Sequence, residues 1–342
     1  MNTDNKSQRV SIVLPVYNGE RYLRRAVDSI VNQTFTDFEL IICDNASTDK
    51  TEDICREYAH HDERVHYHRH AENQGPNLNF SQGVAMASGE YFKWAAHDDE
   101  FAPNFLEACV KALEDNPQAI LCQSLISIID ENGKQLAVYD SDLTYASASR
   151  QSARFSSLVL QPHVCTDLFG LIRLNALKKT NLLWGNYHGC DRALLAELAL
   201  IGSYEKIAKP LFMNREHKQR YVRSILPSQR ATHHNTALRY KTELSRLLLF
   251  RDYWRAIRSH AESRTHRVRC YWHLLRWWFV AWNSLRVGVE LISRVHPPFY
   301  DHAKRLSDII IAPQHTTVFS AKIKDSKLKH ENSTIQSGKP LL

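Results

Sequence analysis

The chain has 342 residues, 43% of them hydrophobic and 24% charged, so it can bury a core without disulfide staples. Its seven cysteines are scattered and include no Cys-x-x-Cys spacing, which argues against a disulfide framework and a zinc knuckle. A polar start and the lack of ~18 consecutive apolar residues argue against a signal peptide and a membrane-spanning helix, so we expect a cytoplasmic protein, soluble or peripheral at the membrane.

The formal charge of +7 is distributed unevenly along the chain. Residues 1–216 carry 21 Lys and Arg against 29 Asp and Glu, whereas residues 217–342 carry 23 against 8. Such asymmetry is typical of a tail that meets a membrane or a nucleic acid, although a basic helix is often only a solvated face.

Strand and helix patterns alternate four times in the N-terminal part of the chain. Compact apolar runs bounded by turn residues predict strands at residues 10–14, 38–43 and 64–68, and from 90 to Asp98–Asp99. Apolar residues at helical spacing predict helices at residues 20–32, 50–58 and 78–86. Parallel strands need crossover connections, so the alternation predicts an α/β fold with a mostly parallel sheet and helices on both faces.

The run from Glu90 ends in the acidic cluster His97-Asp98-Asp99-Glu100. Two adjacent carboxylates suit a divalent cation, because Mg²⁺ takes oxygen ligands and is usually held by one or two carboxylates plus substrate phosphates. A solvated acidic loop fits these residues equally well when they are taken alone.

Loops that follow different strands should meet at one edge of this sheet, where open α/β sheets bind ligands. Those loops carry Tyr17, Asp44 and Asp98–Asp99, and the chain has no dinucleotide or P-loop glycine motif. A nucleotide can bind if Asp44 accepts hydrogen bonds from the base, Tyr17 packs on it, and a cation joins its diphosphate to Asp99. Alternatively, Asp44 only caps the following turn.

The second half of the α/β region is less regular. Further elements are predicted as a helix at 104–114, a strand at 118–129, a hairpin turn at 130–134, a strand at 164–173, a helix at 175–180 and an edge strand at 211–217. Residues 139–157 show no period and are expected to form a loop. The loop lies over the open face, where an acceptor or a lid would lie, or it is only a surface excursion.

Asp191 stands between a glycine-containing aromatic loop and an apolar-periodic helix. A carboxylate in this place can cap the helix. It can also act as the general base that takes a proton from an attacking hydroxyl, and the two roles are compatible.

Five motifs, in this order, resemble those of family-2 inverting glycosyltransferases. They are Val10–Glu20 with Tyr22–Leu23, Gln33–Phe35, Glu39–Thr51, Asn73–Gly75 with Asn79, and His97–Asp99. The resemblance covers about residues 8–220 and implies the GT-A fold. It also implies transfer of a sugar from a nucleotide-diphosphate donor, with Mg²⁺ or Mn²⁺ bound by the acidic motif.

The resemblance further implies roles for single residues on the donor side. Pro15 and Tyr17 would flank the nucleoside, Asp44 would contact the base, Asp98 the ribose or sugar, and Asp99 the metal.

On the acceptor side, Asp191 would be the catalytic base. His217 would complete the metal sphere or touch the diphosphate, unless it is simply solvated. Two departures leave details open: Asn45-Ala46 stands where the family often has Asp-Gly, and His97 stands where many members carry Asp.

The C-terminal third predicts two long helices, 236–260 and 265–295, followed by a polar, disordered tail. One apolar stripe in the second helix comprises Tyr271, Leu275, Trp278, Trp282, Leu285, Val289 and Ile292. With its flanking arginines, the stripe fits a helix in a membrane interface or, as we favour slightly, a seam packed against protein. The predicted division is 1–220, 221–311 and 312–342.

The function expected from the sequence is therefore inverting sugar transfer to a hydroxyl of a glycan or lipid-linked saccharide, at the cytoplasmic face. The alternative is a non-catalytic nucleotide-sugar or membrane-binding module that retains the fold. A third possibility is a nucleic-acid binder that uses the basic helices, but we do not expect a nucleic acid to be a partner.

Overall fold

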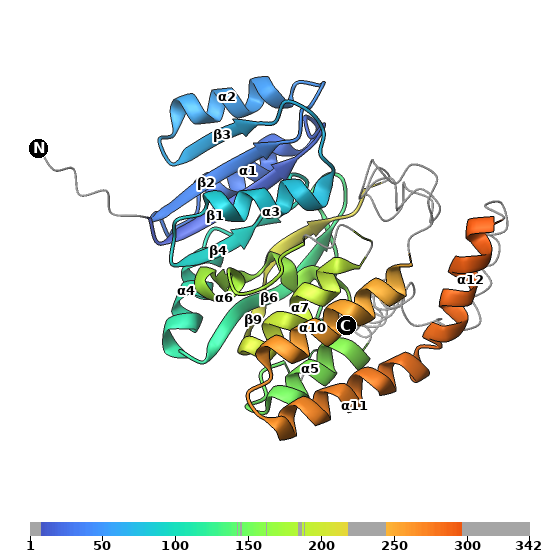
Figure 1. The fold of residues 1–342 in the computed structure, drawn as a ribbon. Coiled ribbons are helices and arrows are strands. Elements are labelled where there is room, and N and C mark those ends of the chain that lie inside the picture. Colours follow the sequence, from blue (N-terminus) through green and yellow to red (C-terminus); the bar gives the residue numbers. More distant parts are fainter. Residues whose placement is uncertain are drawn as a thin grey trace, which may run out of the picture.

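The computed structural model describes residues 8–141, 143, 146–161, 163–183, 187, 189–217 and 244–295. These residues form one sheet of nine strands with helices against both faces (Figure 1). The strands are β1 Val10–Val16, β2 Phe38–Asp44, β3 Val65–Arg69, β4 Tyr91–Trp94, β5 Glu100–Phe101, β6 Ala119–Ile129, β7 Gln135–Tyr139, β8 Leu171–Arg173 and β9 Ser203–Arg215.

The helices in the described residues fall into an N-terminal and a C-terminal set. The first set is α1 Leu23–Val31, α2 Thr51–His61, α3 Pro76–Met86, α4 Phe105–Asp115, α5 Gln151–Leu160, α6 Leu174–Leu177 and α7 Cys190–Ile201, with a 3₁₀ turn η1 at Cys165–Phe169. The second set is α10 Ser245–His260, α11 Arg264–Val280 and α12 Asn283–Val295.

The sheet has the order β3-β2-β1-β4-β8-β6-β9-β5, with β7 paired to β6. β1 runs parallel to both β2 and β4, β2 to β3, and β6 to β9. The chain moves outward from β1 to β3 and then returns to the other side of β1 with β4, so the strand order reverses between β1 and β4. The predicted α/β class with a mostly parallel sheet is confirmed.

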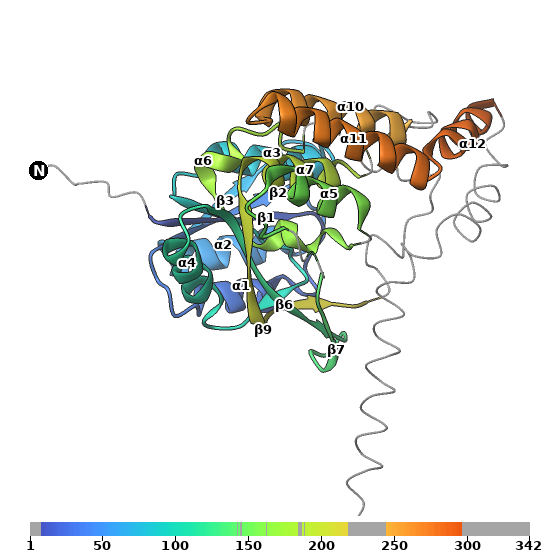
Figure 2. The same cartoon turned by 90° about the horizontal axis from the view of Figure 1, so that it is seen from below.

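Two hydrophobic cores cover the two faces, because successive strand side chains point to opposite sides. Figure 2 shows α1, α2 and α4 on one face of the sheet and α3, α6 and α7 on the other. Ile12 and Leu40 pack in the core of the first face, whereas the neighbouring Val13 and Ile41 pack in the core of the second.

Several predicted elements of the α/β region differ from the observed ones. The predicted strand 164–173 is a 3₁₀ turn at Cys165–Phe169 followed by the short strand β8. The fourth strand ends at Trp94, so Asp98 and Asp99 lie in the loop that follows it. Residues 139–157 were expected to be a loop, but residues 151–160 form α5, whose buried face packs on α7. The predicted edge strand is the end of β9, which pairs along its length with β6 and also with β5, so it is not an edge.

The C-terminal helices pack on the second core through aromatic rings from three helices. Tyr253 of α10 lies edge-on to Phe155 of α5 and to Trp277 of α11, with centroids 5.9 and 5.3 Å apart. The predicted helix 265–295 is broken at Trp282, where φ is 51°, and α11 buries Cys270, Leu274 and Trp277. Packing against protein therefore occurs through these buried residues and through part of the predicted stripe, because the rings of Tyr271 and Trp278 lie 4.2 and 5.2 Å, centroid to centroid, from Trp254 and Phe250 of α10.

Two other predictions fall where the chain is not described. The boundary near residue 220 and the tail 312–342 lie outside the described residues. Among the helices that are described, none has the length and apolarity that crossing a bilayer requires.

Lys93 is buried in the middle of β4, with 1% of its surface exposed. Its ammonium group donates a hydrogen bond to the Phe169 carbonyl and lies 3.9 and 4.3 Å from the ring centroids of Phe101 and Phe105. Burial lowers the pKa of Lys93 to about 7, because the charged form has lost its water.

Replacing Lys93 with methionine should change how stability depends on pH. Above about pH 7 the folded chain releases the lysine proton while the unfolded chain keeps it to about pH 10, so stability rises with pH in this window. Urea unfolding between pH 7 and 9 should show wild type gaining about 1.4 kcal/mol per pH unit over Lys93→Met. Parallel stability curves for the two proteins would refute the lowered pKa.

Candidate active site

The loops after β1, β2 and β4 lie at one edge of the sheet, as the topology requires. Val16 at the end of β1 is in register with Asp44 at the end of β2, and Val13 of β1 is in register with Trp94 at the end of β4. The Ala95 N–H continues this pairing by donating to the Val13 carbonyl, 2.8 Å away. The residues that follow these three strands are therefore neighbours.

The loop after β1 holds the Tyr17 ring outward, with 44% of the residue exposed. Asn18, at φ 51°, donates its N–H to Ser47 Oγ and accepts from the Thr48 N–H, at 2.9 and 2.8 Å. A Cβ on Gly19 would lie 2.9 Å from the His97 ring, so glycine is needed there. Tyr17 thus exposes its aromatic ring on a loop that hydrogen bonds hold in place. Pro15, in contrast, is buried within β1.

Asp44 is fully buried at the end of β2. Its Oδ1 accepts the Ser47 N–H at 2.9 Å, and its Oδ2 accepts the Tyr67 hydroxyl at 2.7 Å with Arg69 Nε 3.5 Å away. The carboxylate therefore closes the turn after β2, which is the alternative role foreseen for it. Contact with a base stays a prediction and would need Tyr67 or Arg69 to move.

The turn closed by Asp44 contains Ala46 at φ 60°, where the resembled family often has glycine. An L-residue in this region is strained by about 1 kcal/mol, and glycine is not. Ala46→Gly should therefore raise the free energy of unfolding in urea by about 0.5–1 kcal/mol. Ala59→Gly, inside α2, should lower the free energy of unfolding by a similar amount. If both variants changed the free energy of unfolding in the same direction, Ala46 would not be strained.

The acidic loop, residues 97–100, follows β4, and within it Asp98 faces His217, which follows β9. Asp98 Oδ2 lies 2.9 Å from His217 Nε2, and the two side chains are 16% and 6% exposed. The His217 ring also packs on Tyr22, with centroids 5.0 Å apart. The solvated alternative for His217 is therefore wrong.

The Asp98–His217 pair offers one carboxylate, which suits Mg²⁺ or Mn²⁺, and one imidazole, which suits the transition metal Mn²⁺ better than the oxygen-preferring Mg²⁺. A diphosphate and water would supply the remaining ligands. The other ring nitrogen of His217, Nδ1, is buried without a hydrogen-bond partner among the described residues. No group of three or more His, Cys, Asp or Glu placed to hold a metal occurs in the described part of the chain. The pair thus fits a cation that the substrate helps to hold.

Asp99 points inward, with 3% of its surface exposed. Its carboxylate accepts the Asn214 side-chain amide at 3.0 and 3.1 Å and the Arg215 N–H at 2.8 Å. These bonds tie the acidic loop to the end of β9. In this arrangement Asp99 positions the loop, and it is Asp98 that faces the histidine.

Arg215 is a buried residue that holds the acidic loop in place, a role that the sequence did not indicate. Its guanidinium donates to the carbonyls of Asp98 and Asp130 at 3.0 and 2.9 Å, forms an ion pair with Glu100, and lies 5.0 Å from the Tyr22 ring centroid. Burial lowers the pKa of Arg215 from its usual value. The positive charge of the Arg215 guanidinium thus offsets the negative charge of the acidic loop. The available signal was a charged residue two positions after the apolar run Leu211–Met213.

Asp191 lies in the first turn of α7, where Gly189 at φ +99° is the N-cap residue. The carboxylate does not cap the helix: its Oδ1 accepts the adjacent Arg192 N–H at 2.9 Å, and the carboxylate is also hydrogen-bonded to the Cys165 thiol. Asp191 is therefore at the helix start, as predicted, but is not the N-cap. The predicted aromatic loop before it falls partly outside the described residues.

The start of α7 lies at the same sheet edge as the other site residues. Cys190 Sγ accepts the Asn77 amide at 3.3 Å, and Asn77 is in the first turn of α3. Asn79 of the same helix donates to the Cys43 carbonyl, next to Asp44, at 2.9 Å. The residue adjacent to Asp191 is thus linked through α3 to the end of β2.

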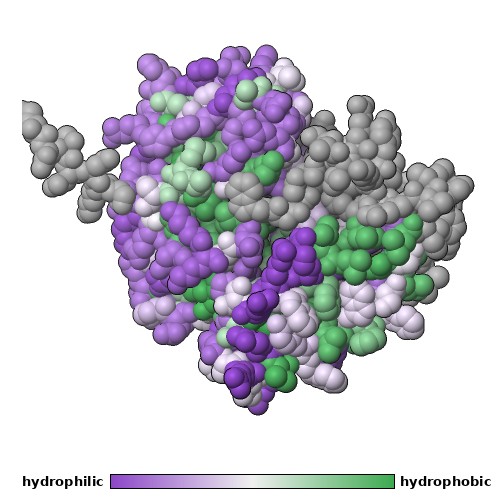
Figure 3. Space-filling model, in the orientation of Figure 1, coloured by the Kyte–Doolittle hydropathy of each residue, from purple (hydrophilic) through white to green (hydrophobic). Residues whose placement is uncertain are grey.

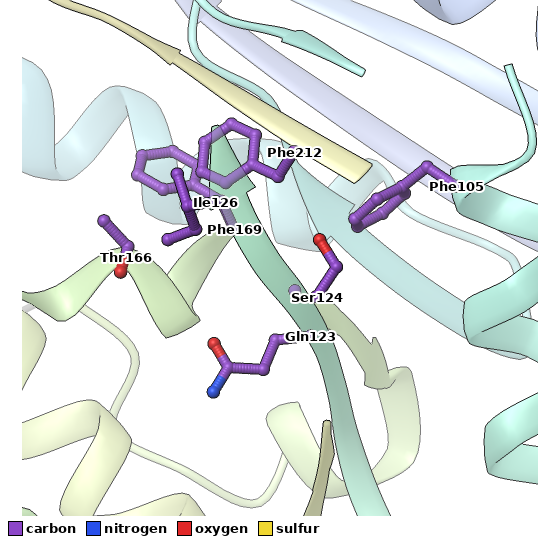
Figure 4. Close-up of a pocket in the computed structure, with 8 residues that line it drawn as sticks. Phe105, Gln123, Ser124, Ile126, Thr166, Phe169 and Phe212 are labelled. Atoms are coloured by element: carbon purple, nitrogen blue, oxygen red, sulfur yellow. The ribbon is translucent and has the colours of Figure 1, made fainter. Parts of the chain in front are cut away.

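The small cavity in Figure 4 lies among Phe105, Phe169 and Phe212, three residues that also contact the Lys93 ammonium group. It has a volume of about 10 Å³ and is lined by Phe105, Gln123, Ser124, Ile126, Thr166, Phe169, Gly170 and Phe212. Such a space holds about one water, so it is too small for a sugar nucleotide. The loops after β1, β2 and β4 are therefore a better candidate than this cavity for a sugar-nucleotide site.

Comparisons with known proteins identify relatives of the N-terminal half. The model of glycosyl transferase family 2 matches residues 11–180. An uncharacterized glycosyltransferase of Rickettsia typhi is 34% identical over 170 residues, which are 49% of this chain and 52% of the relative. Another, from Methanocaldococcus jannaschii, is 36% identical over 129 residues, or 37% of this chain and 44% of the relative. The match spans about half the length of the first of these curated relatives.

Solved structures resemble more of the chain. S. aureus TarS in complex with UDP-GlcNAc has a TM-score of 0.56 at 17% identity, covering 79% of this chain and 72% of that one. The mannosyltransferase PcManGT from Pyrobaculum calidifontis, in complex with GDP-Man and Mn²⁺, has a TM-score of 0.53 at 15% identity, covering 95% and 87%. These likenesses confirm the predicted GT-A fold.

Proposed function

Because residues 11–180 belong to glycosyl transferase family 2, we propose that the protein transfers a sugar, with inversion, from a nucleotide-diphosphate donor to a hydroxyl of a glycan or lipid-linked saccharide. The observation that carries the proposal is the gathering of an exposed Tyr17 ring, the Asp98–His217 pair and the start of α7 at one sheet edge. The donors in the titles of the two solved structures, UDP-GlcNAc and GDP-Man, support this substrate class.

In the proposed site, the donor base packs on Tyr17, and Pro15 fixes the strand end from which that loop leaves. Asp44 shapes the adjoining turn and contacts the base edge if its present partners yield. Asp98 and His217 would hold the Mg²⁺ or Mn²⁺, a role predicted from the sequence for Asp99 and His217. When bound, the cation would offset the charge that grows on the leaving diphosphate.

Asp191 serves as the general base in this proposal. As the acceptor oxygen forms its bond to the anomeric carbon, its proton passes to the Asp191 carboxylate, and the bond from that carbon to the diphosphate oxygen breaks. Attack from the face opposite the leaving group inverts the configuration. Arg192 is held beside Asp191 by its bond to the His163 carbonyl, 2.8 Å away, so a fixed positive charge flanks the base.

The proposal also assigns the protein to the cytoplasm, with the C-terminal helices in peripheral contact with a membrane. Exposed aromatic and arginine side chains on α11 support this contact. Incubating the purified chain with a panel of nucleotide sugars, with and without Mn²⁺, tests the function. Metal-dependent release of nucleotide from one or a few donors is expected, and failure to bind any nucleotide sugar would refute the proposal.

A further inference from the structure

The outward face of α11 is a row of apolar side chains directly opposite its buried face. Successive steps of four, three and four residues separate Val268, Trp272, Leu275 and Phe279, which places them on one side of the helix. They are 68%, 66%, 46% and 73% exposed, whereas Cys270, Leu274 and Trp277 on the other side are buried. We call these four exposed residues the outer stripe.

The exposed apolar surface continues beyond the end of α11. Val280, Trp282 and Leu285 are 65%, 62% and 53% exposed, and the turn at Trp282 carries the surface onto α12. In Figure 3, green and white residues gather over the C-terminal helices at the lower right, whereas the upper part of the molecule is mostly purple. Large contiguous patches of this kind mark interaction sites rather than ordinary surface.

Arginines border the outer stripe. The four on α11, all exposed, are Arg264, Arg267, Arg269 and Arg276. The helix has no Asp or Glu, and among the described residues no carboxylate lies within 4.0 Å of any of these guanidinium groups. The surface therefore combines uncovered aromatic rings with positive charge that no described side chain neutralises.

We propose that the outer stripe inserts into the interface of a bilayer that contains anionic phospholipids, with the α11 arginines on the headgroups. This extends the membrane contact of the proposed function to a defined face. Trp and Phe on an arginine-flanked helix are suited to the headgroup and upper acyl region. A second copy of the chain fits less well, because pairing two such faces would bring arginines together with no acid between them.

Vesicle binding by the full chain tests the proposal. The protein should bind vesicles of phosphatidylcholine and phosphatidylglycerol at low salt, and it should bind pure phosphatidylcholine vesicles at least about tenfold more weakly. The double variant Trp272→Ser, Phe279→Ser should bind the mixed vesicles at least about tenfold more weakly than wild type. Both side chains are exposed, so folding should be unaffected.

The charge contribution has its own variant and control. Arg269→Gln with Arg276→Gln should weaken binding roughly fivefold per arginine and reduce its salt dependence. Val138→Ser on β7 and Lys111→Gln on α4 remove an exposed apolar group and an exposed charge elsewhere and should change nothing.

Three results would overturn the inference: binding that ignores lipid charge, vesicle binding that survives the stripe variant, or a dimer in sedimentation that the stripe variant dissociates. Donor hydrolysis, measured without vesicles, should be unchanged in the stripe variant. Loss of hydrolysis alone would therefore bear on the proposed chemistry and not on the membrane face.

Discussion

Asp191→Asn should lower the rate of sugar transfer by a factor of about 10²–10⁴ and leave nucleotide binding unchanged. The variant keeps the hydrogen bond to the Arg192 N–H, because the asparagine side-chain oxygen can still accept it. It cannot take the acceptor proton. Transfer rates with the donor identified by the nucleotide-sugar panel, together with calorimetric titration by the nucleotide and Mn²⁺, measure both quantities.

Asp53→Asn is a matched control, since Asp53 also lies in the first turn of a helix, α2, and is exposed. Its transfer rate should equal that of wild type. An Asp191→Asn protein that transfers sugar at the wild-type rate would remove Asp191 from the chemistry. A wild-type protein that binds donor but never turns it over would favour the non-catalytic module instead.

Asp98→Asn and Asp99→Asn should fail in different ways. Asp98→Asn should weaken Mn²⁺-dependent binding of UDP or GDP about 100-fold or more, because the carboxylate that faces His217 loses its charge. Asp99→Asn should instead lower the free energy of unfolding by about 1–3 kcal/mol, because its new amide group meets the donors of Asn214 and Arg215. Titration calorimetry and urea unfolding of both variants separate the two effects.

Asp115→Asn, which removes an exposed acid paired with Lys111, serves as the control for both measurements. It should leave the nucleotide affinity unchanged and alter stability by less than about 1 kcal/mol. If Asp99→Asn rather than Asp98→Asn abolishes the effect of Mn²⁺, the metal role predicted for Asp99 from the sequence is right and the assignment to Asp98 is not.

Much of the N-terminal fold could be predicted because local patterns and tertiary structure agree there. β1 and β2 are short apolar runs that the sheet buries on both faces, and turn residues mark their ends. α5 was missed because its packing face includes Gln151 and Arg154, which donate to the Leu200 and Ala199 carbonyls at the end of α7. The apolar residues of this face, Phe155, Leu158 and Val159, span little more than one helical turn, so the apolar periodicity is short.

The site was predictable as a set of loops but not as a set of contacts. The motifs indicated which strand ends would meet, and the structure brings those ends together. Which acid faces His217 depends on the bonds from Asn214 and Arg215 that turn Asp99 inward, across more than 100 residues of sequence. Two adjacent acids in a motif do not indicate which of them will face His217.

The C-terminal helices show a related limit. A stripe through Tyr271, Leu275 and Trp278 steps by four and three, but Val268, Trp272 and Phe279 form an equally regular row on α11. Periodicity alone cannot say which row a neighbour covers. The edge-on contacts of Tyr253 with Phe155 and Trp277 fix the rotation of α11 and leave the outer stripe uncovered.

The proposed chemistry requires one bound sugar nucleotide to lie between the Asp98–His217 pair and Asp191. A crystal structure of the protein with Mn²⁺ and the donor it hydrolyses tests this most directly. We expect Mn²⁺ bound by Asp98 and His217, the base on Tyr17, and the anomeric carbon facing the Asp191 carboxylate. A donor bound at another edge of the sheet, or an Asp191 side chain turned away from the sugar, would contradict it.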